Sequence, residues 1–566
     1  MSEASRPPHD STRKLGIGSR GLRARGAPNF RELQVHSLNR YDDIVIGGGH
    51  NGLIAAAYLA RAGRNVLLVE KNERVGGATY SEEILPGFTA TVFSYVVSLL
   101  RPQIIDDLDL ARHGLQLQAL DGTFTPLPDG RALTRWHDPA KTRESLLQFS
   151  RRDADNYPLF GLRMHQLSRG IRDLLSMRPP RVGSVRPREL RGLVELASHF
   201  SGLGDRRFHE LARLMTASAS DYLGRWFETD ALKATMAASG IVGTFLSISS
   251  PGTAYVLLHH YMGEIDGASR SWGFQRGGMG AVADTLANAA RSFGAEIRTS
   301  AGVERILTSG GRAAGVVLEG GEEVFADQVG SSVDPRRTFL GMLDADELPG
   351  EFVEAIRRYR FQGSSGKVNL ALDALPDFTA LPGPGPHLRG AISISPDSVT
   401  LERAYDDAKY GSFSRRPFMD VMIPSLIDPG MAPPGKHVMS IFVQYAPYHL
   451  SGEGGDWDAR RDAFGDAVIR TLAEYAPNLP DIILERQVLT PLDIERRTGL
   501  TEGNIFQGEL GLDQLFFLRP AAGWAQFHTP VRSLFLCGSG AHPGGGVMGA
   551  PGKMGAEAML HAAGAA

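Results

Sequence analysis

A glycine-rich turn between an apolar strand and a helix is the feature that most constrains this chain. The turn has the pattern Gly47-x-Gly49-x-x-Gly52, follows the apolar run 44–46 and leads into a segment rich in small residues. In a dinucleotide-binding βαβ unit the first glycine permits a tight turn, the second lets the backbone approach the pyrophosphate, and the third lets the helix pack on the strand. The start of that helix directs free N–H groups at the anion. The pattern therefore predicts a dinucleotide site on a Rossmann-like unit.

A second apolar strand ends at Glu70, about 20 residues further on, where a ribose-binding acid is expected. Lys71, Arg74 and the pair Gly76-Gly77 follow at once. A second glycine pair at this point lets the backbone run along the cofactor, with Arg74 available to a phosphate or to a flavin edge. An ordinary turn with a solvated Arg74 is the alternative. Together with the C-terminal segment, this arrangement favours FAD as the dinucleotide.

The C-terminal segment contains a second glycine-rich loop. It follows an apolar strand that ends at Cys537, and a helix is expected after it, from Pro551 to Leu560, because proline suits the first turn of a helix. The start of this helix would direct its dipole at the pyrimidine edge of a flavin and favour the anionic reduced ring. The residues of this loop expected to contact the cofactor are Gly538, Gly540, Gly545, Gly546 and Val547.

Several segments resemble a known group of flavoproteins. They are 48–52 (which includes His50 and Asn51), 94–102, 257–260, 277–280, 504–506 and 538–552. In these segments the chain resembles the phytoene desaturase-like flavoproteins of the amine oxidase and glutathione reductase-type superfamily, and in particular the family named pyridine nucleotide-disulfide oxidoreductase domain-containing protein 2. The resemblance implies that backbone at Val303 contacts adenine. It also implies a location in the mitochondrial matrix and a link to respiratory function through a cytochrome oxidase subunit.

The expected fold class is α/β, with a Rossmann-like FAD-binding domain of the glutathione reductase and amine oxidase type interleaved with an α+β substrate domain. A helical apolar period occupies much of 141–238, and alternating apolar residues in 365–447 indicate an antiparallel sheet. A disordered basic tail (1–40) is expected to precede an FAD-binding domain built from the three segments 41–140, 261–340 and 489–566. A helical cap (141–260) and the substrate sheet (341–488) are expected between those segments.

Composition excludes several function classes. A net charge of −3 provides no basic field, so no nucleic-acid partner is expected. The single cysteine, Cys537, rules out an intramolecular disulfide and a redox cysteine pair, and its apolar surroundings indicate a small core residue. No apolar run is long enough to span a membrane, so at most peripheral membrane contact is expected.

The distribution and type of the basic residues bear on where the protein is located. Residues 1–40 hold eight Lys or Arg against three acids, which favours a disordered tail over the alternative of a mitochondrial transit peptide. Only eight of the sixty basic residues are Lys, which suggests high-GC coding and hence a bacterial cytoplasmic protein; the mitochondrial matrix is the alternative.

A bound flavin would carry the redox step by accepting a hydride at N5, so the protein must mainly position substrate and exclude water. His542, in the C-terminal loop, is the candidate catalytic residue, with a purely structural histidine as the alternative. No metal site is expected, because the adjacent His259 and His260 point apart and no Cys cluster exists. The chain has no second GxGxxG, which suggests that electrons leave to oxygen, a quinone or another protein.

The sequence therefore predicts an FAD-dependent oxidoreductase of the dehydrogenase or desaturase type that acts on an apolar small molecule. One alternative is a flavin-dependent ketolase or monooxygenase. The other is a flavin-bearing interaction protein.

Overall fold

A computed structural model describes residues 40–181, 183–265, 268–269, 272–451 and 455–564. The expected disordered tail lies almost entirely outside the described residues. The first described element is the strand β1.

Strands from three distant regions of the chain form the first sheet, in the order β11-β2-β1-β14-β13-β12, with β20 beside β14. Their bounds are β1 Arg40–Ile46, β2 Val66–Val69, β11 Glu296–Arg298, β12 Val303–Ser309, β13 Arg312–Leu318, β14 Glu323–Ser331 and β20 Leu534–Leu536. β1, β2 and β11 run parallel, as do β14 and β20, whereas β12, β13 and β14 are antiparallel neighbours. Every residue of β2 is buried, as expected for a central parallel strand that is covered on both faces.

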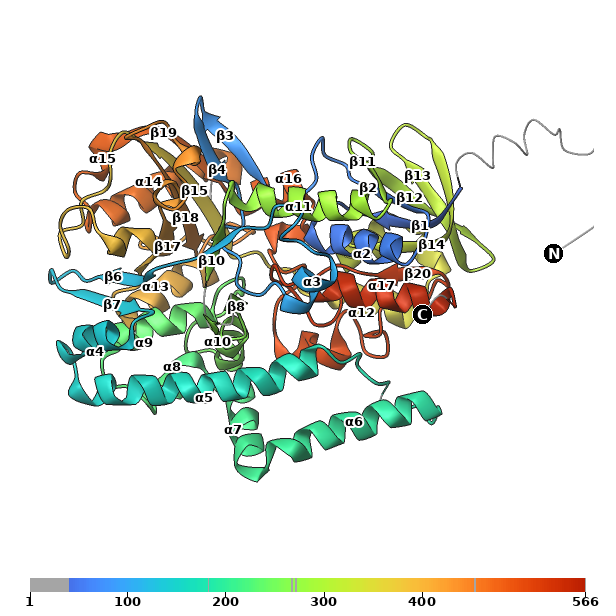
Figure 1. Cartoon of the computed structure of the whole chain (residues 1–566), viewed down its shortest axis with the longest axis horizontal. Helices are drawn as coiled ribbons and strands as arrows, with labels where there is room; N and C mark the ends of the chain where they lie inside the picture. The colour runs from blue at the N-terminus through green and yellow to red at the C-terminus, as the bar shows by residue number, and fades with distance from the viewer. Residues whose placement is uncertain (1–39, 182, 266–267, 270–271, 452–454, 565–566) are drawn as a thin grey trace, which may run out of the picture. The chain divides into compact units, whose positions relative to one another are not determined.

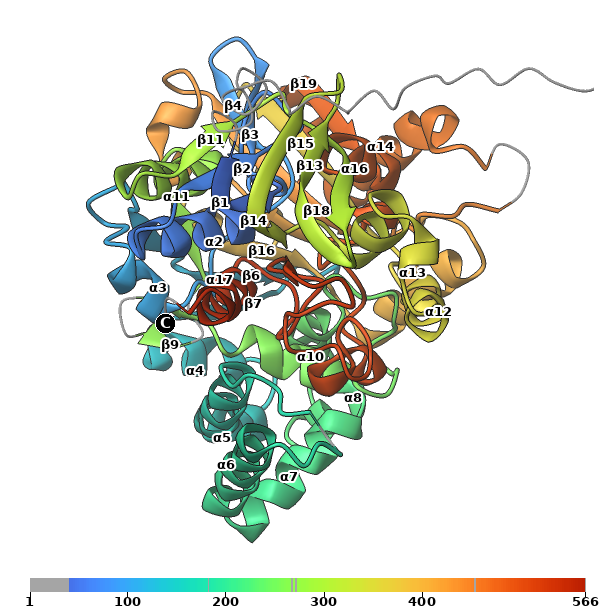
Figure 2. The ribbon, with the colours of Figure 1, turned by 90° about the vertical axis from the view of Figure 1, so that its right-hand side faces the viewer.

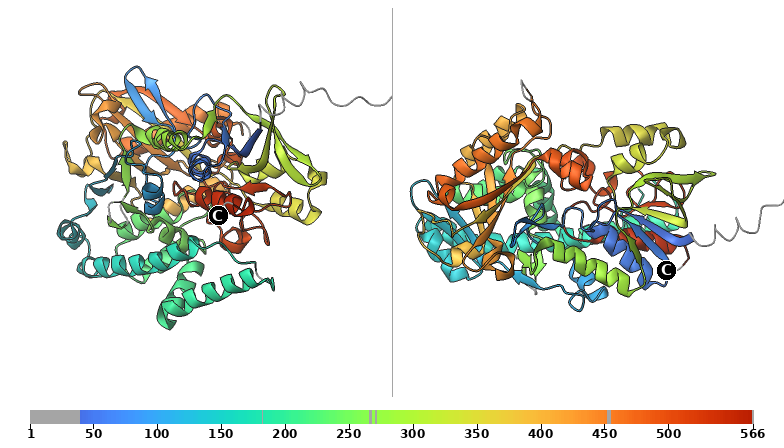
Figure 3. Two further views of the ribbon diagram at one scale, coloured as in Figure 1. Left: turned by 45° about the vertical axis from the view of Figure 1, so that its right-hand side comes forward. Right: turned by 90° about the horizontal axis from the view of Figure 1, so that it is seen from above.

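Three helices lie side by side against this sheet: α2 (His50–Arg61), α11 (Gly278–Ser292) and α17 (Ala550–Ala562). Figure 1, Figure 2 and the left view of Figure 3 show α2 between the other two. The contact between α2 and α17 requires a glycine, because a Cβ at Gly552 would lie 2.3 Å from the Asn51 carbonyl oxygen. Among the described residues, the first and last helices therefore meet backbone to backbone.

The second sheet has the order β19-β15-β18-β17-β16-β6-β7. Its bounds are β6 Gly122–Pro126, β7 Ala132–Trp136, β15 Ser365–Leu372, β16 Ala391–Ile394, β17 Phe418–Met422, β18 His437–Gln444 and β19 Ile483–Leu489. The expected alternation is present in β15, where Val368 and Leu370 enter an apolar core and Asn369 lies on the other face. That polar face is buried as well, because β4 (Phe88–Thr91) covers it, and Ser440 donates to Asn369 Oδ1 at 3.1 Å.

Helices cover one side of the second sheet. They are α4 (Pro139–Leu147), α5 (Arg151–Leu175), α6 (Pro187–Leu203), α7 (Asp205–Thr216), α8 (Ala219–Gly224), α9 (Asp230–Ala237) and α10 (Thr253–His260). Their apolar residues share a core with Phe418 and Phe442 of the sheet. The pair α6 and α7 lies at the edge of this helical region, away from both sheets (Figure 2).

The remaining helices pack elsewhere on the two sheets, including the second face of the second sheet. They are α3 (Pro102–Asp107), α12 (Gly350–Arg358), α13 (Ser398–Lys409), α14 (Trp457–Ala473), α15 (Leu479–Ile482) and α16 (Pro491–Thr498). Two short hairpins pair β3 (Ser81–Leu85) with β4, and β8 (Glu264–Ile265) with β9 (Ala268–Ser269). The distant strands β5 (Leu117–Ala119) and β10 (Gly273–Gln275) form a separate antiparallel pair.

Two boundaries differ from those expected from the sequence. The hairpin β6–β7 falls within 41–140, yet β6 pairs in parallel with β16 of the second sheet. Conversely, α12 falls within 341–488, but Phe352, Val353 and Ile356 pack into the core of the first sheet. Short strands and helices carry no local signal of the sheet they will join, because that choice is made by long-range pairing and packing.

Arg519 holds the C-terminal region of the chain together. Its side chain is fully buried and makes no ion pair among the described residues. Instead, its guanidinium donates over 2.8–3.5 Å to the backbone carbonyls of Phe506, Gln507, Gly508, Glu509, Gln514 and Ser539. A planar group with five donors is suited to such a set of acceptors. It joins the segment 506–514 to the start of the C-terminal glycine-rich loop.

Arg519→Lys is expected to lower the free energy of unfolding by about 3 kcal/mol, because lysine has fewer donors and leaves buried carbonyls without partners. Urea unfolding followed by circular dichroism measures this. The matched control is Arg532→Lys, at an exposed arginine that donates to a single carbonyl, Gly310 O. Equal stability of the two variants would show that the buried guanidinium does not hold this region.

Candidate functional site

A cavity of about 310 Å³ lies at the carboxyl ends of β1, β2 and β14 and at the start of α2. This is the edge of a parallel sheet at which nucleotides bind in doubly wound folds. The residues expected to bind cofactor that line it are Gly47, Gly49, His50, Asn51, Glu70, Lys71, Gly77 and Val303. We call it the cofactor cavity.

The glycine turn has the geometry that its pattern predicts. Gly47 adopts a φ of +95°, and a Cβ at Gly52 would lie 2.0 Å from the Gly47 carbonyl oxygen. At Gly49, by contrast, a Cβ would meet no atom within 4 Å, and the φ of −69° suits any residue. Gly49 is therefore required neither by backbone conformation nor by protein packing, and the space in front of it is a cradle of the kind that a pyrophosphate fills at a helix start.

Glu70 is held in place at the end of β2. Its buried carboxylate accepts hydrogen bonds from Gly48 N at 2.7 Å and from Asn72 N at 2.9 Å. One acceptor site on each oxygen remains, which fits the expected hydrogen bonds to a ribose.

The two ends of the chain meet at this cavity. His50 Nε2 donates to the Gly546 carbonyl at 3.1 Å, and Asn51 Nδ2 donates to Ser539 Oγ at 3.0 Å. Burial lowers the pKa of His50 to about 4, so its ring is neutral near pH 7. Its contact orients the C-terminal loop over the start of α2.

The C-terminal glycines build the wall around the cavity, and the cavity surface itself contains Ser539 rather than any of them. A Cβ at Gly538 would lie 2.3 Å from the Ser332 carbonyl oxygen, and one at Gly540 would lie 2.3 Å from Pro335 Cδ. At Gly545 the nearest atom would be Phe506 Cδ1, at 2.4 Å. Gly546 contributes its carbonyl to His50, and Val547 packs against the first core. Direct contact of these residues with the cofactor stays a prediction.

Arg74 and Gly76 also lie outside the lining of the cavity. Arg74 is exposed and lies near Asp284, which is the environment of the solvated alternative. Gly76 donates to the Gly48 carbonyl at 2.8 Å and so supports the glycine turn from behind. The position of Arg74 does not support the expected contact with a phosphate or a flavin edge.

Several residues that line the cavity were not predicted from the sequence. Ser332, Asp334 and Gln507 line the cofactor cavity with Ser539. Gln507 donates to the Ser332 carbonyl at 2.8 Å and accepts from Gly540 N at 2.8 Å, so it ties two walls together. Ser332 and Asp334 follow the carboxyl end of β14. The rule that sites form at these strand ends would have found them, had β14 been recognised as a strand of the central sheet.

Two cations lie at the rim of the cofactor cavity. Lys71 and Arg337 both line it, and burial together with the charge of Arg337 lowers the pKa of Lys71. A position where two cations stand close together favours an anionic ligand nearby.

Buried polar atoms without partners gather around the C-terminal loop. Among the described residues, Asn51 Oδ1 and both ring nitrogens of His259 and of His542 have no hydrogen-bond partner. Such atoms normally bind protein, water or ligand. Asn51 lines the cofactor cavity, so its free Oδ1 and the open cradle at Gly49 fit a large polar cofactor: the turn and the start of α2 would hold the pyrophosphate of FAD, and Glu70 the ribose.

The family of the chain follows from comparison with known proteins. A model of flavin-containing amine oxidoreductases matches residues 52–551, from the third glycine of the turn into the last helix. The chain belongs to this family. It is an FAD-dependent oxidoreductase, and the expected cofactor and the expected fold class are confirmed.

Two relatives and one solved structure illustrate this placement. Rat "Pyridine nucleotide-disulfide oxidoreductase domain-containing protein 2" is 41% identical over 96% of this chain and 98% of its own length. Phytoene desaturase of Neurospora crassa is 24% identical over 89% of this chain and 82% of its own length. The solved structure of a putrescine oxidase variant, 16% identical, aligns over 93% of this chain and 99% of that chain with a TM-score of 0.56 and shows the same fold. The expected resemblance is confirmed.

A redox-active pair of cysteines within the chain cannot form in this flavoenzyme, whatever the name of the rat relative suggests. Cys537 is the single cysteine, is fully buried, and has a pKa raised by burial to about 12. In the described portion of the chain, no three His, Cys, Asp or Glu side chains are grouped so that they could hold a metal ion. Within the same residues, no helix combines the length and apolar character that crossing a membrane requires.

Gly49→Val is expected to weaken FAD binding by about 100-fold or more, because the isopropyl group would enter the space for the pyrophosphate, while the apoprotein keeps its fold. Flavin absorbance after reconstitution and thermal unfolding of the apoprotein give the two readouts. The contrasting variant is Gly52→Ala, which is expected to destabilise the apoprotein itself because its Cβ would clash with backbone. A fully yellow Gly49→Val protein would contradict the assigned cradle.

Acid is expected to destabilise the fold through its buried neutral histidines. Burial lowers the pKa of His259 to about 3, whereas an unfolded histidine titrates near 6.5. Below about pH 6.5 the unfolded chain therefore takes up a proton that the folded chain does not, and this residue alone costs about 2 kcal/mol between pH 7 and pH 5. His259→Gln should reduce the pH dependence of the unfolding free energy by that amount in urea titrations. If His259→Gln left the pH dependence of the unfolding free energy unchanged, the His259 ring would take up a proton as readily in the folded state as in the unfolded chain.

Proposed function

We propose that this flavoenzyme dehydrogenates a largely apolar small molecule. The observation that carries the proposal is an apolar cavity of about 240 Å³ formed by α5, α6, α7 and the segments around Phe516 and His542. Its lining consists of Ile171, Leu174, Met177, Pro179, Pro180, Leu196, Phe200, Phe208, Leu211, Ala212, Met215, Phe516, Phe517 and His542. His542 is the one polar residue in that lining.

The position of His542 supports a connection between the two cavities. Ser539 lines the cofactor cavity and His542, three residues later in the same loop, lines the apolar cavity. A substrate held among α5, α6 and α7 would therefore bind against the loop that closes the cofactor cavity. The name of the Neurospora relative, phytoene desaturase, describes removal of hydrogen from a hydrocarbon and supports the same class of reaction.

The residues of the chain would act mainly by positioning the substrate and excluding water. FAD, when bound, supplies the hydride acceptor. Burial lowers the pKa of His542 to about 3, which makes its ring neutral and a weak base at pH 7. We therefore infer that His542 holds a polar group of the substrate by a hydrogen bond, and that the apolar walls keep solvent away.

The proposal also covers the electron acceptor and the partners of the enzyme. Oxygen, a quinone or a protein would take the electrons. The resemblance to the rat relative's family suggests a respiratory-chain partner in the mitochondrial matrix, and the alternative is a bacterial cytoplasmic enzyme.

Exposed apolar residues in the helical region support peripheral membrane contact. Val185, Leu190, Val194 and Phe208, on or beside α6 and α7, are 85%, 47%, 67% and 43% exposed. An apolar substrate dissolved in lipid would meet the enzyme there.

The test begins with mass spectrometry of the molecule that co-purifies with the yellow protein, followed by anaerobic mixing of that molecule with the flavin-loaded enzyme. Ala212→Trp, which would fill the apolar cavity from α7, is expected to slow flavin reduction by about tenfold or more without loss of FAD. The matched control is Ala197→Trp on an exposed position of α6, which should reduce flavin at the wild-type rate.

Four outcomes would contradict the proposal or favour one of its alternatives. Equal rates in the two tryptophan variants would show that the apolar cavity does not hold the substrate. Incorporation of labelled oxygen into the product would favour a ketolase or monooxygenase. Retention of biological function in the flavin-free Gly49→Val protein would favour an interaction protein. Rapid bleaching by anaerobic NADPH would contradict the proposed electron acceptors.

A further inference from the structure

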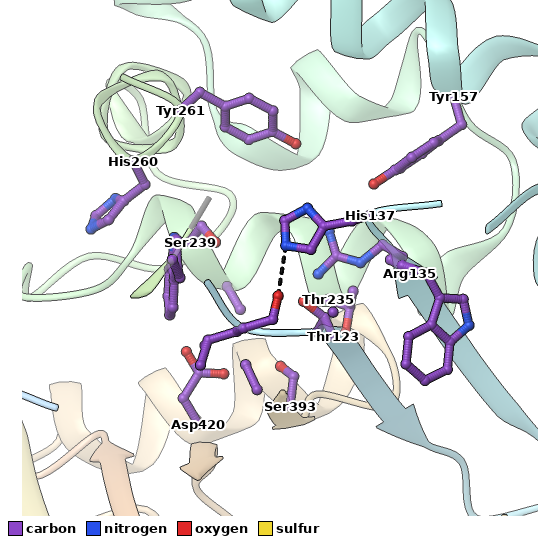
Figure 4. Close-up of a pocket in the computed structure, with 16 residues that line it drawn as sticks. Thr123, Arg135, His137, Tyr157, Thr235, Ser239, His260, Tyr261, Ser393 and Asp420 are labelled. Atoms are coloured by element: carbon purple, nitrogen blue, oxygen red, sulfur yellow. Dashed lines mark hydrogen bonds between the residues drawn. The ribbon is translucent and has the colours of Figure 1, made fainter. Parts of the chain in front are cut away.

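A third cavity, of about 140 Å³, lies on the far side of α10 from the C-terminal loop. It is formed by β6, β7, β16 and β17 with α9 and the end of α10. Neither the cofactor cavity nor the apolar cavity shares a lining residue with it. Figure 4 shows the polar side chains of Arg135, Tyr157, Ser239, Tyr261 and Asp420 around its centre. We call it the Arg135 pocket.

Arg135 is the group in this pocket that needs a partner. Its guanidinium extends from β7 towards the middle of the pocket (Figure 4). Its Nε is buried with no hydrogen-bond partner, and it makes no ion pair with a carboxylate of the described residues. Two histidines also line the pocket: His137 Nε2 donates to the Leu120 carbonyl at 2.6 Å, and burial lowers the pKa of His260. A half-buried guanidinium with an open face is a site for an anion.

The carboxylate of the pocket is already bonded. Asp420 lies on the floor and accepts a hydrogen bond from Tyr95 OH at 3.2 Å. Burial raises the pKa of Asp420 to about 6, although the charge of Arg135 acts against this, so a fraction of its charge is already lost near neutral pH. Ser393, its neighbour in Figure 4, bonds with Ser395 at 3.0 Å. Asp420 is an electrostatic neighbour of Arg135, but the described residues provide no hydrogen-bond partner for the buried Nε of Arg135, so this donor remains open to a ligand.

The walls indicate the size and character of the ligand. Trp136 and Trp272 line the pocket and offer flat apolar surfaces. Tyr157 and Ser239 add hydroxyl groups that can donate to an anion. The volume equals roughly five water molecules, which restricts the ligand to a small molecule or the end of a larger one.

We propose that the Arg135 pocket binds the carboxylate group of a small organic acid, with Arg135 as its charged partner and the two indoles beside its apolar body. A carboxylate matches the planar fork of a guanidinium with two parallel hydrogen bonds. This ligand is distinct from the apolar substrate, so the enzyme has a second binding site for an acidic molecule.

The proposal is tested by titrating benzoate, and in parallel hexanoate and acetate, into the flavin-loaded protein. Binding is followed by calorimetry and by the fluorescence of the tryptophans that line the pocket. Benzamide, which has the shape of benzoate without its charge, is expected to bind at least about tenfold more weakly. Arg135→Gln should weaken the binding of benzoate by a similar factor. Arg143→Gln, at an exposed arginine of α4 that pairs with Asp155, should leave it unchanged.

Asp420→Asn gives a prediction of opposite sign. Removal of the neighbouring negative charge, with the hydrogen bond from Tyr95 retained, should tighten benzoate binding several-fold at pH 8. The proposal is overturned if none of the three acids binds, if benzamide binds as well as benzoate, or if Arg135→Gln binds benzoate like the wild type. None of these readouts requires turnover, so they stand or fall independently of the proposed dehydrogenation.

Discussion

The close backbone contact between the first and last helices is the constraint on which the rest of the structure depends. At Gly552, α17 approaches the Asn51 carbonyl so closely that no side chain fits between them. The same approach puts Ser539 within hydrogen-bond distance of Asn51, and the Gly546 carbonyl within reach of His50. A cofactor cavity whose two walls are nearly 500 residues apart in the chain exists because this contact is possible.

Arg519 connects the C-terminal loop, which lies beside that contact, with the segment 506–514. A fully buried cation is costly unless its donors are used, and here the guanidinium reaches six backbone carbonyls instead of a carboxylate. Two of those carbonyls belong to Gln507 and Ser539, which both line the cofactor cavity. The wall that faces the cofactor is thus held by a residue that does not touch the cavity. Its hydrogen bonds give the irregular C-terminal segment the rigidity that a sheet would otherwise supply.

The three cavities differ in chemistry because different elements line them. Strand ends and a helix start surround the cofactor cavity with backbone groups and a few charges. Helical faces surround the apolar cavity, where His542 is the sole polar lining residue. The edge of the second sheet, with Arg135 and Asp420, forms the third. The helix α10 stands between the last two, with Tyr255 beside Phe516 of one wall and His260 in the other. The proposed apolar substrate and the proposed organic acid would therefore bind at separate places in this flavoenzyme.

The sequence by itself determined the glycine turn, the strand that ends at Glu70, the helix after the C-terminal loop and the presence of FAD. These features depend on local backbone geometry, which spacing within a few residues records. Tertiary structure alone decided that β6 and β7 join the second sheet, that Gly538 and Gly540 lie behind the cavity wall, and that Arg74 faces solvent. It also decided that Ser332 and Gln507 line the cavity and that Arg135 is left without a partner. These outcomes depend on which distant segments come into contact, and no local pattern specifies that choice.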